Sequence, residues 1–463
     1  MNGFKLLFSL VTLHLVLVTI SFGQWLETII YLPDSSCPTA LCYNPTNNKI
    51  YCANRGSPPS YDPTVTIIDG ATNQIITTVV VGSEPIDLCY NPVSNKVYCA
   101  NISSYDVTVI DGATDTVIAT VWTGSLPSAL CCNSQDNKVY CANQGHGYVS
   151  IIDGTTDTVI TTAIASGNPR ALCYNPNDNK VYCSSAFADR VTVIDGTTNR
   201  VVTTVPTGTG PYKLCYNSQN NKVYCANFGV GFSDCTVTII DGTTNQVLDT
   251  IRLSNAPRIL CYNPLENKVY CSTFEWSSSN YDSTIVVIDG TNDTIITTVS
   301  TSHRLSELCY NPLNNKVYCA NVGIDPVYDS TVSVLDGATN QLLRTIVVVG
   351  CPSTFCHNPQ QNRVYVASSR NSSISVLRDS MPPGIEECWS LQVDQPPLTA
   401  TIVRGVLNLQ SEIYNLKPEI ALLDISGRKV TDLKPGVNDI HHLAPGIYFL
   451  RLGTTTKKLL LVK

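Results

Sequence analysis

The chain has 463 residues, of which 43% are hydrophobic and only 14% are charged, and its formal net charge is -7. The low charged fraction argues against long disordered arms, and an acidic balance without a Lys/Arg cluster argues against nucleic acid as the main partner. The 20 cysteines are too few for a miniprotein built on disulfides and too many for an ordinary cytosolic enzyme.

The first 23 residues have the layout of an export signal. Lys5 is followed by an apolar run over residues 6–20 that is broken only by Ser, Thr and one His, and Ser21-Phe22-Gly23 supplies the small residues that a signal peptidase site needs. The run is shorter than the roughly 20 residues of a transmembrane helix, although a retained anchor is the alternative. We therefore predict a signal peptide over residues 1–23 and a mature protein outside the cytoplasm with no membrane span.

Most of the chain is an internal repeat. A Leu-Cys-Tyr-Asn-Pro segment that begins at Leu41 recurs in near copies, and its cysteine returns at spacings of 47, 42, 42, 42, 46, 48 and 47 residues. A period in the forties with β-branched residues and Asp-Gly turns is typical of four-stranded propeller blades. In the first unit we expect strands over residues 40–43, 49–53, 64–68 and 74–80. One turn asparagine, Asn48 in the first unit, recurs in every unit, and we expect it to adopt a left-handed conformation.

The ends of the repeat predict how the ring closes. Eight copies of the first three strands are present, and the last copy stops near Leu377 without a fourth strand. Residues 27–32 stand before the first copy at the spacing of a fourth strand, so they can complete the last blade and remove an open sheet edge. The predicted fold class is therefore all-β, with an eight-bladed propeller over residues 24–379 that is closed by an N-terminal strand.

The repeat unit resembles the YVTN family of β-propeller repeats. Gly82-Ser83-Glu84-Pro85, Tyr98-Cys99-Ala100-Asn101 and Val107-Thr108-Val109-Ile110-Asp111 follow the family's Gly-x-x-Pro, Tyr-Val-x-Asn and Val-x-Val-Ile-Asp segments. The resemblance covers the whole repeat region and departs from the family in its cysteines. It implies architecture more than activity, because proteins of many functions share this fold.

Seven units carry a second cysteine ten residues after the first, and the eighth has Val366 at that place. The even separation can place both side chains of a hairpin on one face, unless the turn has a different parity. Two interpretations stay open: cross-strand disulfides, or buried thiols that pack as small hydrophobic groups between blades. Isolated pairs lack the remaining ligands of a metal site, so we expect no metal. The pairs are Cys42 and Cys52, Cys89 and Cys99, Cys131 and Cys141, Cys173 and Cys183, Cys215 and Cys225, Cys261 and Cys271, and Cys309 and Cys319.

A second domain follows the repeat. We place a linker at residues 380–388 and a small Ig-like β-sandwich at residues 389–463. Its Asp-x-x-Gly-Arg-x-Val, Leu-x-Pro-Gly-x-Tyr and Lys-Lys segments together resemble the type A C-terminal sorting domain of the type IX secretion system. The resemblance implies a diderm bacterium, export through the periplasm, and that secretion machinery as a partner; an Ig-like adhesion module is the alternative. The motif residues are Asp424, Gly427, Arg428, Val430, Pro445, Gly446, Tyr448, Lys457 and Lys458.

The sequence carries few signs of catalysis. It has no nucleophile elbow, no His-Glu-x-x-His zinc motif and no phosphate loop, so we expect no cofactor. A site of two carboxylates needs no local motif, so an enzyme is not excluded. We expect a secreted or surface-attached protein that binds an extracellular glycan or protein, and an extracellular lyase or glycan hydrolase is the alternative.

The candidate site follows from propeller geometry. Loops that enter the innermost strands gather at one mouth of the central channel, and the loops between second and third strands should share that face. Basic residues of three consecutive units are expected to form an anion-attracting sector, and solvated loop charges are the alternative. The candidate residues are Asp87, Arg170, Tyr212, Lys213, Arg258, Glu307, Trp276 and Tyr281.

Overall fold

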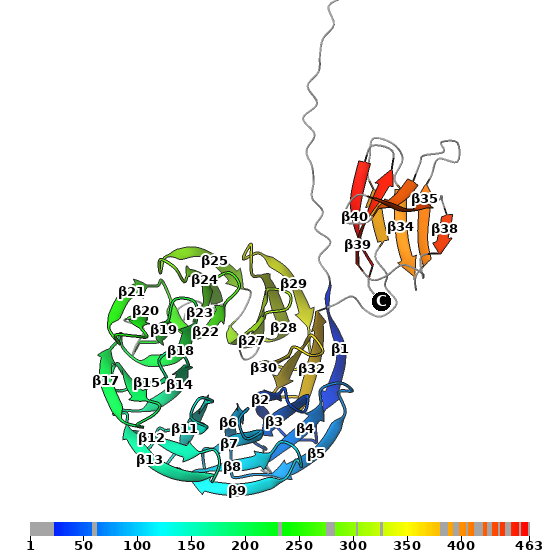
Figure 1. The fold of residues 1–463 in the computed structure, drawn as a ribbon. Coiled ribbons are helices and arrows are strands. Elements are labelled where there is room, and N and C mark those ends of the chain that lie inside the picture. The colour runs from blue at the N-terminus through cyan, green and yellow to red at the C-terminus, as the bar shows by residue number, and fades with distance from the viewer. Residues whose placement is uncertain are drawn as a thin grey trace, which may run out of the picture. The chain divides into compact units, whose positions relative to one another are not determined.

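Eight four-stranded antiparallel sheets are arranged in a ring (Figure 1), which confirms the predicted eight-bladed propeller and its all-β class. The structure is a computed structural model. It describes residues 23–57, 63–229, 234–274, 283–301, 304–324, 327–379, 388–391, 398–403, 406–411, 420–423, 428–433, 436–439, 446–452 and 455–461. Within these ranges no helix is long and apolar enough to cross a membrane.

Each of the first seven blades uses four consecutive strands, with the innermost strand first in the chain. The predicted strands of the first unit are confirmed to within two residues. The strands are, blade by blade, β2 (Pro38–Asn44), β3 (Lys49–Asn54), β4 (Thr64–Asp69) and β5 (Ile75–Val80); β6 (Pro85–Asn91), β7 (Lys96–Asn101), β8 (Asp106–Asp111) and β9 (Val117–Trp122); β10 (Pro127–Asn133), β11 (Lys138–Asn143), β12 (Tyr148–Asp153) and β13 (Thr158–Ile164); β14 (Pro169–Asn175), β15 (Lys180–Ser185), β16 (Arg190–Asp195) and β17 (Val201–Pro206); β18 (Pro211–Asn217), β19 (Lys222–Asn227), β20 (Thr236–Asp241) and β21 (Val247–Arg252); β22 (Ala256–Asn263), β23 (Lys268–Phe274), β24 (Ser283–Asp289) and β25 (Ile295–Thr301); β26 (Leu305–Asn311), β27 (Lys316–Ile324), β28 (Val327–Asp336) and β29 (Leu342–Val347).

The eighth blade joins the two ends of the ring. Its strands β30 (Pro352–Asn358), β31 (Arg363–Ser368) and β32 (Ser373–Asp379) are completed by β1 (Gln24–Tyr31), which pairs antiparallel with β32. The predicted closing strand is thereby confirmed. A bulge between Leu26 and Thr28 leaves Glu27 out of the ladder, and its carboxylate lies 2.5 Å from the guanidinium of Arg363.

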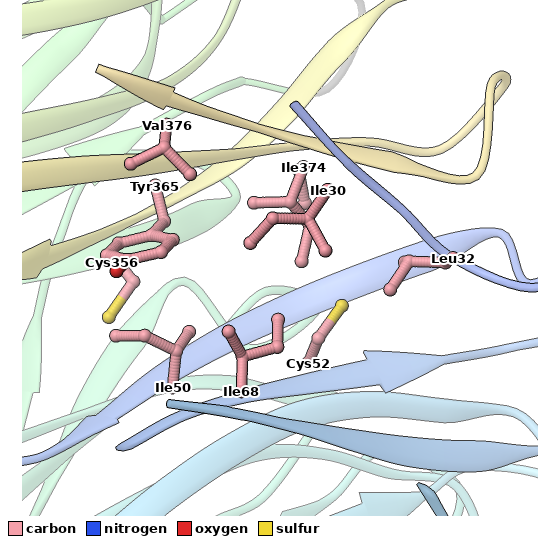
Figure 2. Packing of buried hydrophobic residues seen from close by; sticks show 10 residues of the cluster. Ile30, Leu32, Ile50, Cys52, Ile68, Cys356, Tyr365, Ile374 and Val376 are labelled. Atoms are coloured by element: carbon pink, nitrogen blue, oxygen red, sulfur yellow. The ribbon is translucent and has the colours of Figure 1, made fainter. Parts of the chain in front are cut away.

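Hydrophobic clusters between neighbouring blades form the core. Between the eighth and first blades, Ile30 and Leu32 pack with residues of β31, β32, β3 and β4 (Figure 2). The thiols of Cys52 and Cys356 lie within this cluster, beside apolar side chains of both blades. Cysteine here fills space as a small hydrophobic residue would.

The register separates the two cysteines of each unit. Cys42 pairs with Tyr51, and Cys52 pairs with Leu41, because four residues lie between the paired Asn44 and Lys49. Neighbouring positions on a strand point to opposite faces, so the two thiols point away from each other. Cys52 belongs to the cluster shared with the eighth blade, and Cys42 packs against the cluster shared with the second. The register therefore excludes the shared face that the even separation allowed, and the 19 cysteines within residues 23–379 are free thiols.

A left-handed asparagine turns each blade from its first strand to its second. Asn48 and its seven counterparts have φ between 49° and 52°, which confirms the predicted turn. The same residues also join the blades: Asn44 Nδ2 donates to Asn95 Oδ1 of the next blade at 2.9 Å. Equivalent bonds of 2.7 to 2.9 Å continue around the ring until Asn358 Nδ2 donates to Asn48 Oδ1. We call this closed circle of eight amide–amide hydrogen bonds the asparagine ring.

A basic residue at the start of each second strand ties its blade to the following one. Lys96 Nζ, for example, lies 2.7 Å from a carboxylate oxygen of Asp157 in the turn of the third blade. In the eighth blade the residue is Arg363, which donates to the carbonyl oxygens of Gly70 and Ala71 at 2.7 and 2.8 Å. The sequence analysis did not assign this role to these residues.

The second compact unit spans residues 381–463 and contains two antiparallel four-stranded sheets. One sheet has the order β33 (Cys388–Leu391), β34 (Leu398–Val403), β35 (Val406–Ser411) and β38 (Gly436–Asp439). The other has the order β37 (Lys429–Leu433), β36 (Ile420–Leu423), β39 (Gly446–Leu452) and β40 (Thr455–Leu461).

Candidate ligand-binding site at the channel mouth

A β-bulge near the start of the innermost strands positions three of the predicted site residues. The ladder skips one residue after the opening proline of β14, β18 and β22. The skipped residues are Arg170, Tyr212 and Arg258. A bulge releases a residue from the regular pleat and turns its side chain in a new direction, so these side chains are free to meet at the end of the ring.

These three residues form an arc that runs from the fourth blade to the sixth. The guanidinium carbon of Arg170 lies 4.2 Å from the centre of the Tyr212 ring. Burial raises the pKa of the Tyr212 hydroxyl, but the charges of Arg170 and Arg258 and their hydrogen bonds to it outweigh burial and lower that pKa. The ring of Phe228, from the loop after β19, lies 5.7 Å from that of Tyr212.

Arg304 extends the arc into the seventh blade. Its guanidinium carbon lies 5.4 Å from the centre of the Phe274 ring at the end of β23. Burial and the like charge of Arg258 lower the pKa of Arg304. Its buried Nε has no hydrogen-bond partner among the described residues.

The sequence analysis missed Arg304, although a signal was present. The seventh unit has Leu305 where the other units open the strand with proline, and Arg304 stands directly before it.

Three further candidate residues, Asp87, Lys213 and Glu307, lie two residues after the opening residue of their innermost strands. Lys213 Nζ lies 3.7 Å from a carboxylate oxygen of Glu307, two blades away. Asp87 accepts hydrogen bonds from the backbone N–H groups of Leu88 and Leu130 at 2.9 and 2.8 Å. The structure therefore brings six of the eight predicted residues into one electrostatic network, and we call these six together with Arg304 the channel-mouth cluster.

Burial and mutual charge set the protonation of the carboxyl and amino groups. Burial raises the pKa of Asp87 to about 6, against the opposing effects of the Leu130 N–H and of Lys213. The charge of Glu307 raises the pKa of Lys213 and outweighs burial. Four cationic side chains thus face two carboxylates, of which Asp87 is readily protonated.

Other predicted residues lie elsewhere. Trp276 and Tyr281 fall outside the described residues, as do the signal peptide up to residue 22 and, in the sorting motif, Asp424, Gly427 and Pro445. Arg428 and Val430 are exposed, while Gly446 and Tyr448 lie on β39 and Lys457 and Lys458 on β40. Across the described ranges, no group of three or more His, Cys, Asp or Glu side chains could hold a metal ion.

A pocket of about 520 Å³ lies away from the channel, at the closing strand. Its walls include Glu27 and Arg363, the ion pair that joins β1 to β31. Its polar groups are therefore part of the ring closure.

Comparison with known proteins supports the fold alone. Hydrazine synthase of Kuenenia stuttgartiensis has a TM-score of 0.53 and 17% identity, over 64% of this chain and 97% of that one. Sqt1 of Saccharomyces cerevisiae has a TM-score of 0.63 and 10% identity, over 77% of this chain and 99% of that one. No protein-family model and no curated protein matches the sequence.

Proposed function

We propose that the protein is an extracellular propeller that binds a ligand at the channel mouth and releases it unchanged. The observation that carries this proposal is the convergence of the channel-mouth cluster from five blades. Bulged and loop residues held on a rigid scaffold are a common form of recognition site. The proposed ligand is an extracellular glycan or protein.

A binding screen of the full chain tests this proposal. Neutral and acidic polysaccharides and cell-wall fragments are added, thermal unfolding is followed, and each ligand is recovered and analysed. We expect at least one ligand to raise the melting temperature and to remain intact, and Tyr212→Ala to remove that rise. Tyr31→Ala, at an exposed position on the outermost strand of the eighth blade, is the control that should retain it. An equal shift in Tyr212→Ala would contradict a binding site at this mouth, and the absence of any shift would exclude a glycan and leave a protein as the ligand.

An enzyme remains the second candidate because of one observation. Asp87 combines a pKa of about 6 with a nearby Lys213 and Glu307, and such carboxyl groups serve as general acids or bases. The screen separates the two functions, because a lyase or hydrolase would leave a shortened ligand. Loss of that product in Asp87→Asn would assign the chemistry to this carboxyl group.

We propose further that the propeller belongs with the YVTN-type repeats and that residues 389–463 direct export through a type IX secretion system. The ordered motifs of the repeat and of the C-terminal segment support this. In a diderm bacterium with that system, a full chain bearing a reporter is expected at the outer surface or in the medium. Removal of residues 389–463 should leave it in the periplasm, whereas unchanged release would refute the sorting role.

A further inference from the structure

The arginines of the channel-mouth cluster lack the carboxylate partners that other cations of this protein have. Lys49, Lys96 and Lys222 each lie 2.7 to 2.8 Å from a carboxylate oxygen. No such ion pair is formed by Arg170, Arg258 or Arg304 within the described residues. Their neighbours are instead aromatic rings and one another.

Gathering three guanidinium groups without a counterion is unfavourable in the empty site. Burial disfavours the charged form of Arg304, and the charge of Arg258 acts in the same direction. The buried Nε of Arg304 also loses its hydrogen bonds to water without gaining a protein acceptor. An oxyanion placed between these groups would remove both penalties, because a carboxylate or sulfate accepts several hydrogen bonds from guanidinium groups.

The rings beside the arginines add a second requirement. Tyr212 lies against Arg170 and Phe228 packs against Tyr212, and both rings are half-buried at this mouth, whereas Phe274 beside Arg304 is buried. Aromatic faces suit the apolar side of a sugar ring, and the arginines suit an acidic substituent on it. A neutral glycan would leave the guanidinium groups unpaired, and an inorganic anion would leave the rings uncovered.

We propose that the arc Arg170–Tyr212–Arg258–Arg304 binds an acidic saccharide, with its carboxylate or sulfate group held by the three arginines. This inference rests on the proposed binding function and specifies its ligand class. Lys213 is excluded from the arc because Glu307 already pairs with it.

Calorimetric titration of the full chain tests the inference with three probes of similar length. They are a uronic-acid oligosaccharide, a sulfated oligosaccharide and a neutral oligosaccharide. We expect at least one acidic probe to bind at least tenfold more tightly than the neutral one, and to weaken as salt concentration rises. The comparison of the carboxylated and sulfated probes identifies which oxyanion is preferred.

Arg304→Gln and Arg170→Gln should each weaken binding of the acidic probe at least tenfold. Arg200→Gln, at an exposed turn on the outer side of the fourth blade, is the matched control and should bind normally. The melting temperature of unliganded Arg304→Gln should rise, because the substitution removes a buried like charge. This readout needs no ligand and shows that the variant is folded.

Two results would overturn the inference. The first is equal affinity for the acidic and neutral probes, together with normal binding by Arg304→Gln and loss of binding in Tyr212→Ala. This result would refute an acidic ligand while leaving a channel-mouth site intact. Failure of both acidic probes to bind would refute the acidic saccharide, and a shift with a neutral polysaccharide in the thermal screen would then keep the proposed function. A melting temperature of Arg304→Gln below that of the wild type would show that Arg304 has a structural role instead.

Discussion

The thiols of Cys89 and Cys132 form a pair between the second and third blades. Cys132 stands where the neighbouring units have Tyr90 and Tyr174. Its thiol interacts with Cys89 of the preceding blade, and this interaction lowers the pKa of the Cys132 thiol. The interaction with Cys132 is the largest cause that raises the pKa of Cys89 well above its usual value, and burial is the second. Cys132 is therefore the thiolate-forming member of the pair.

We predict that Cys132 is alkylated at lower pH than Cys235, another half-buried thiol, whose pKa is raised by burial. Alkylating reagents attack the thiolate, so a lower pKa extends the reaction toward neutral pH. Limited labelling of the native protein between pH 6 and 8, mapped by mass spectrometry, measures this order. Cys132→Tyr restores the residue of the other units and should remove the early-labelled site without affecting Cys235. Identical pH profiles for the two cysteines would contradict the prediction.

Asp87 should make folding stability depend on pH in the direction opposite to that of an ion-paired carboxylate. Its folded pKa of about 6 exceeds the unfolded value of roughly 3.9, so the folded state binds its proton more tightly. The free energy of unfolding should therefore fall as pH rises through about 4 to 6, by on the order of 3 kcal/mol in total from this group. Denaturant titrations at several pH values measure this change, and Asp87→Asn should lack that component. A wild-type-minus-variant difference that is constant with pH would contradict it.

The sequence predicted which side chains enter this site but not how they interact. Asp87, Lys213 and Glu307 share a repeat position, and the bulge that follows each opening residue explains why Arg170, Tyr212 and Arg258 meet. The Lys213–Glu307 pair spans two blades, so it depends on the size of the ring, which no local pattern encodes. Arg304 could not be predicted from the repeat position of the other candidates, because it stands directly before the strand and not within it.

At the scale of strands and turns, the repeat period and the turn residues were sufficient to predict most of the fold. Asp-Gly marks the turn to the fourth strand because a Cβ at Gly70 would lie 2.6 Å from the carbonyl oxygen of Asn48. The relation between Cys42 and Cys52 could not be derived, because the number of residues in the intervening turn decides the face on which each thiol lies. Hydrogen bonds between blades, such as Asn44 to Asn95, were likewise hidden because they join residues 51 apart.

The contribution of the asparagine ring to stability can be measured separately from that of the left-handed turn. Asn137 accepts a hydrogen bond from Asn91 at 2.7 Å and has φ of 51°. Asn137→Gly keeps the left-handed backbone and removes the side chain, so the fully buried Asn91 amide loses its acceptor at a cost of about 1–3 kcal/mol. Asn137→Ala should cost roughly 1 kcal/mol more because of backbone strain. Denaturant unfolding measures both changes, and equal stability of Asn137→Gly and wild type would show that the ring contributes nothing.

At the scale of the whole molecule, ring closure distinguishes the eighth blade from the rest. Seven blades consist of contiguous chain, whereas the eighth depends on β1 pairing with β32, about 350 residues later in the sequence. Arg363 reinforces this seam by binding both Glu27 of β1 and the carbonyl oxygens of the first blade. The seam is therefore the place where loss of one side chain can open the ring.

We predict that Arg363→Met destabilises the propeller more than Lys268→Met, the same repeat position inside the sixth blade. Both residues are buried, but Lys268 donates to the carbonyl oxygens of Gly337 and Ala338, whereas Arg363 also neutralises Glu27. Arg378 still lies 3.2 Å from Glu27 after this substitution, so the added cost is below the roughly 3–5 kcal/mol of a buried charge left alone. It comes on top of about 1–3 kcal/mol for the orphaned carbonyl groups, which both variants share. Unfolding monitored by denaturant, with limited proteolysis near residue 24, measures both effects. Equal losses for the two variants, without new cleavage near β1, would show that the ring unfolds as one unit with no weaker seam.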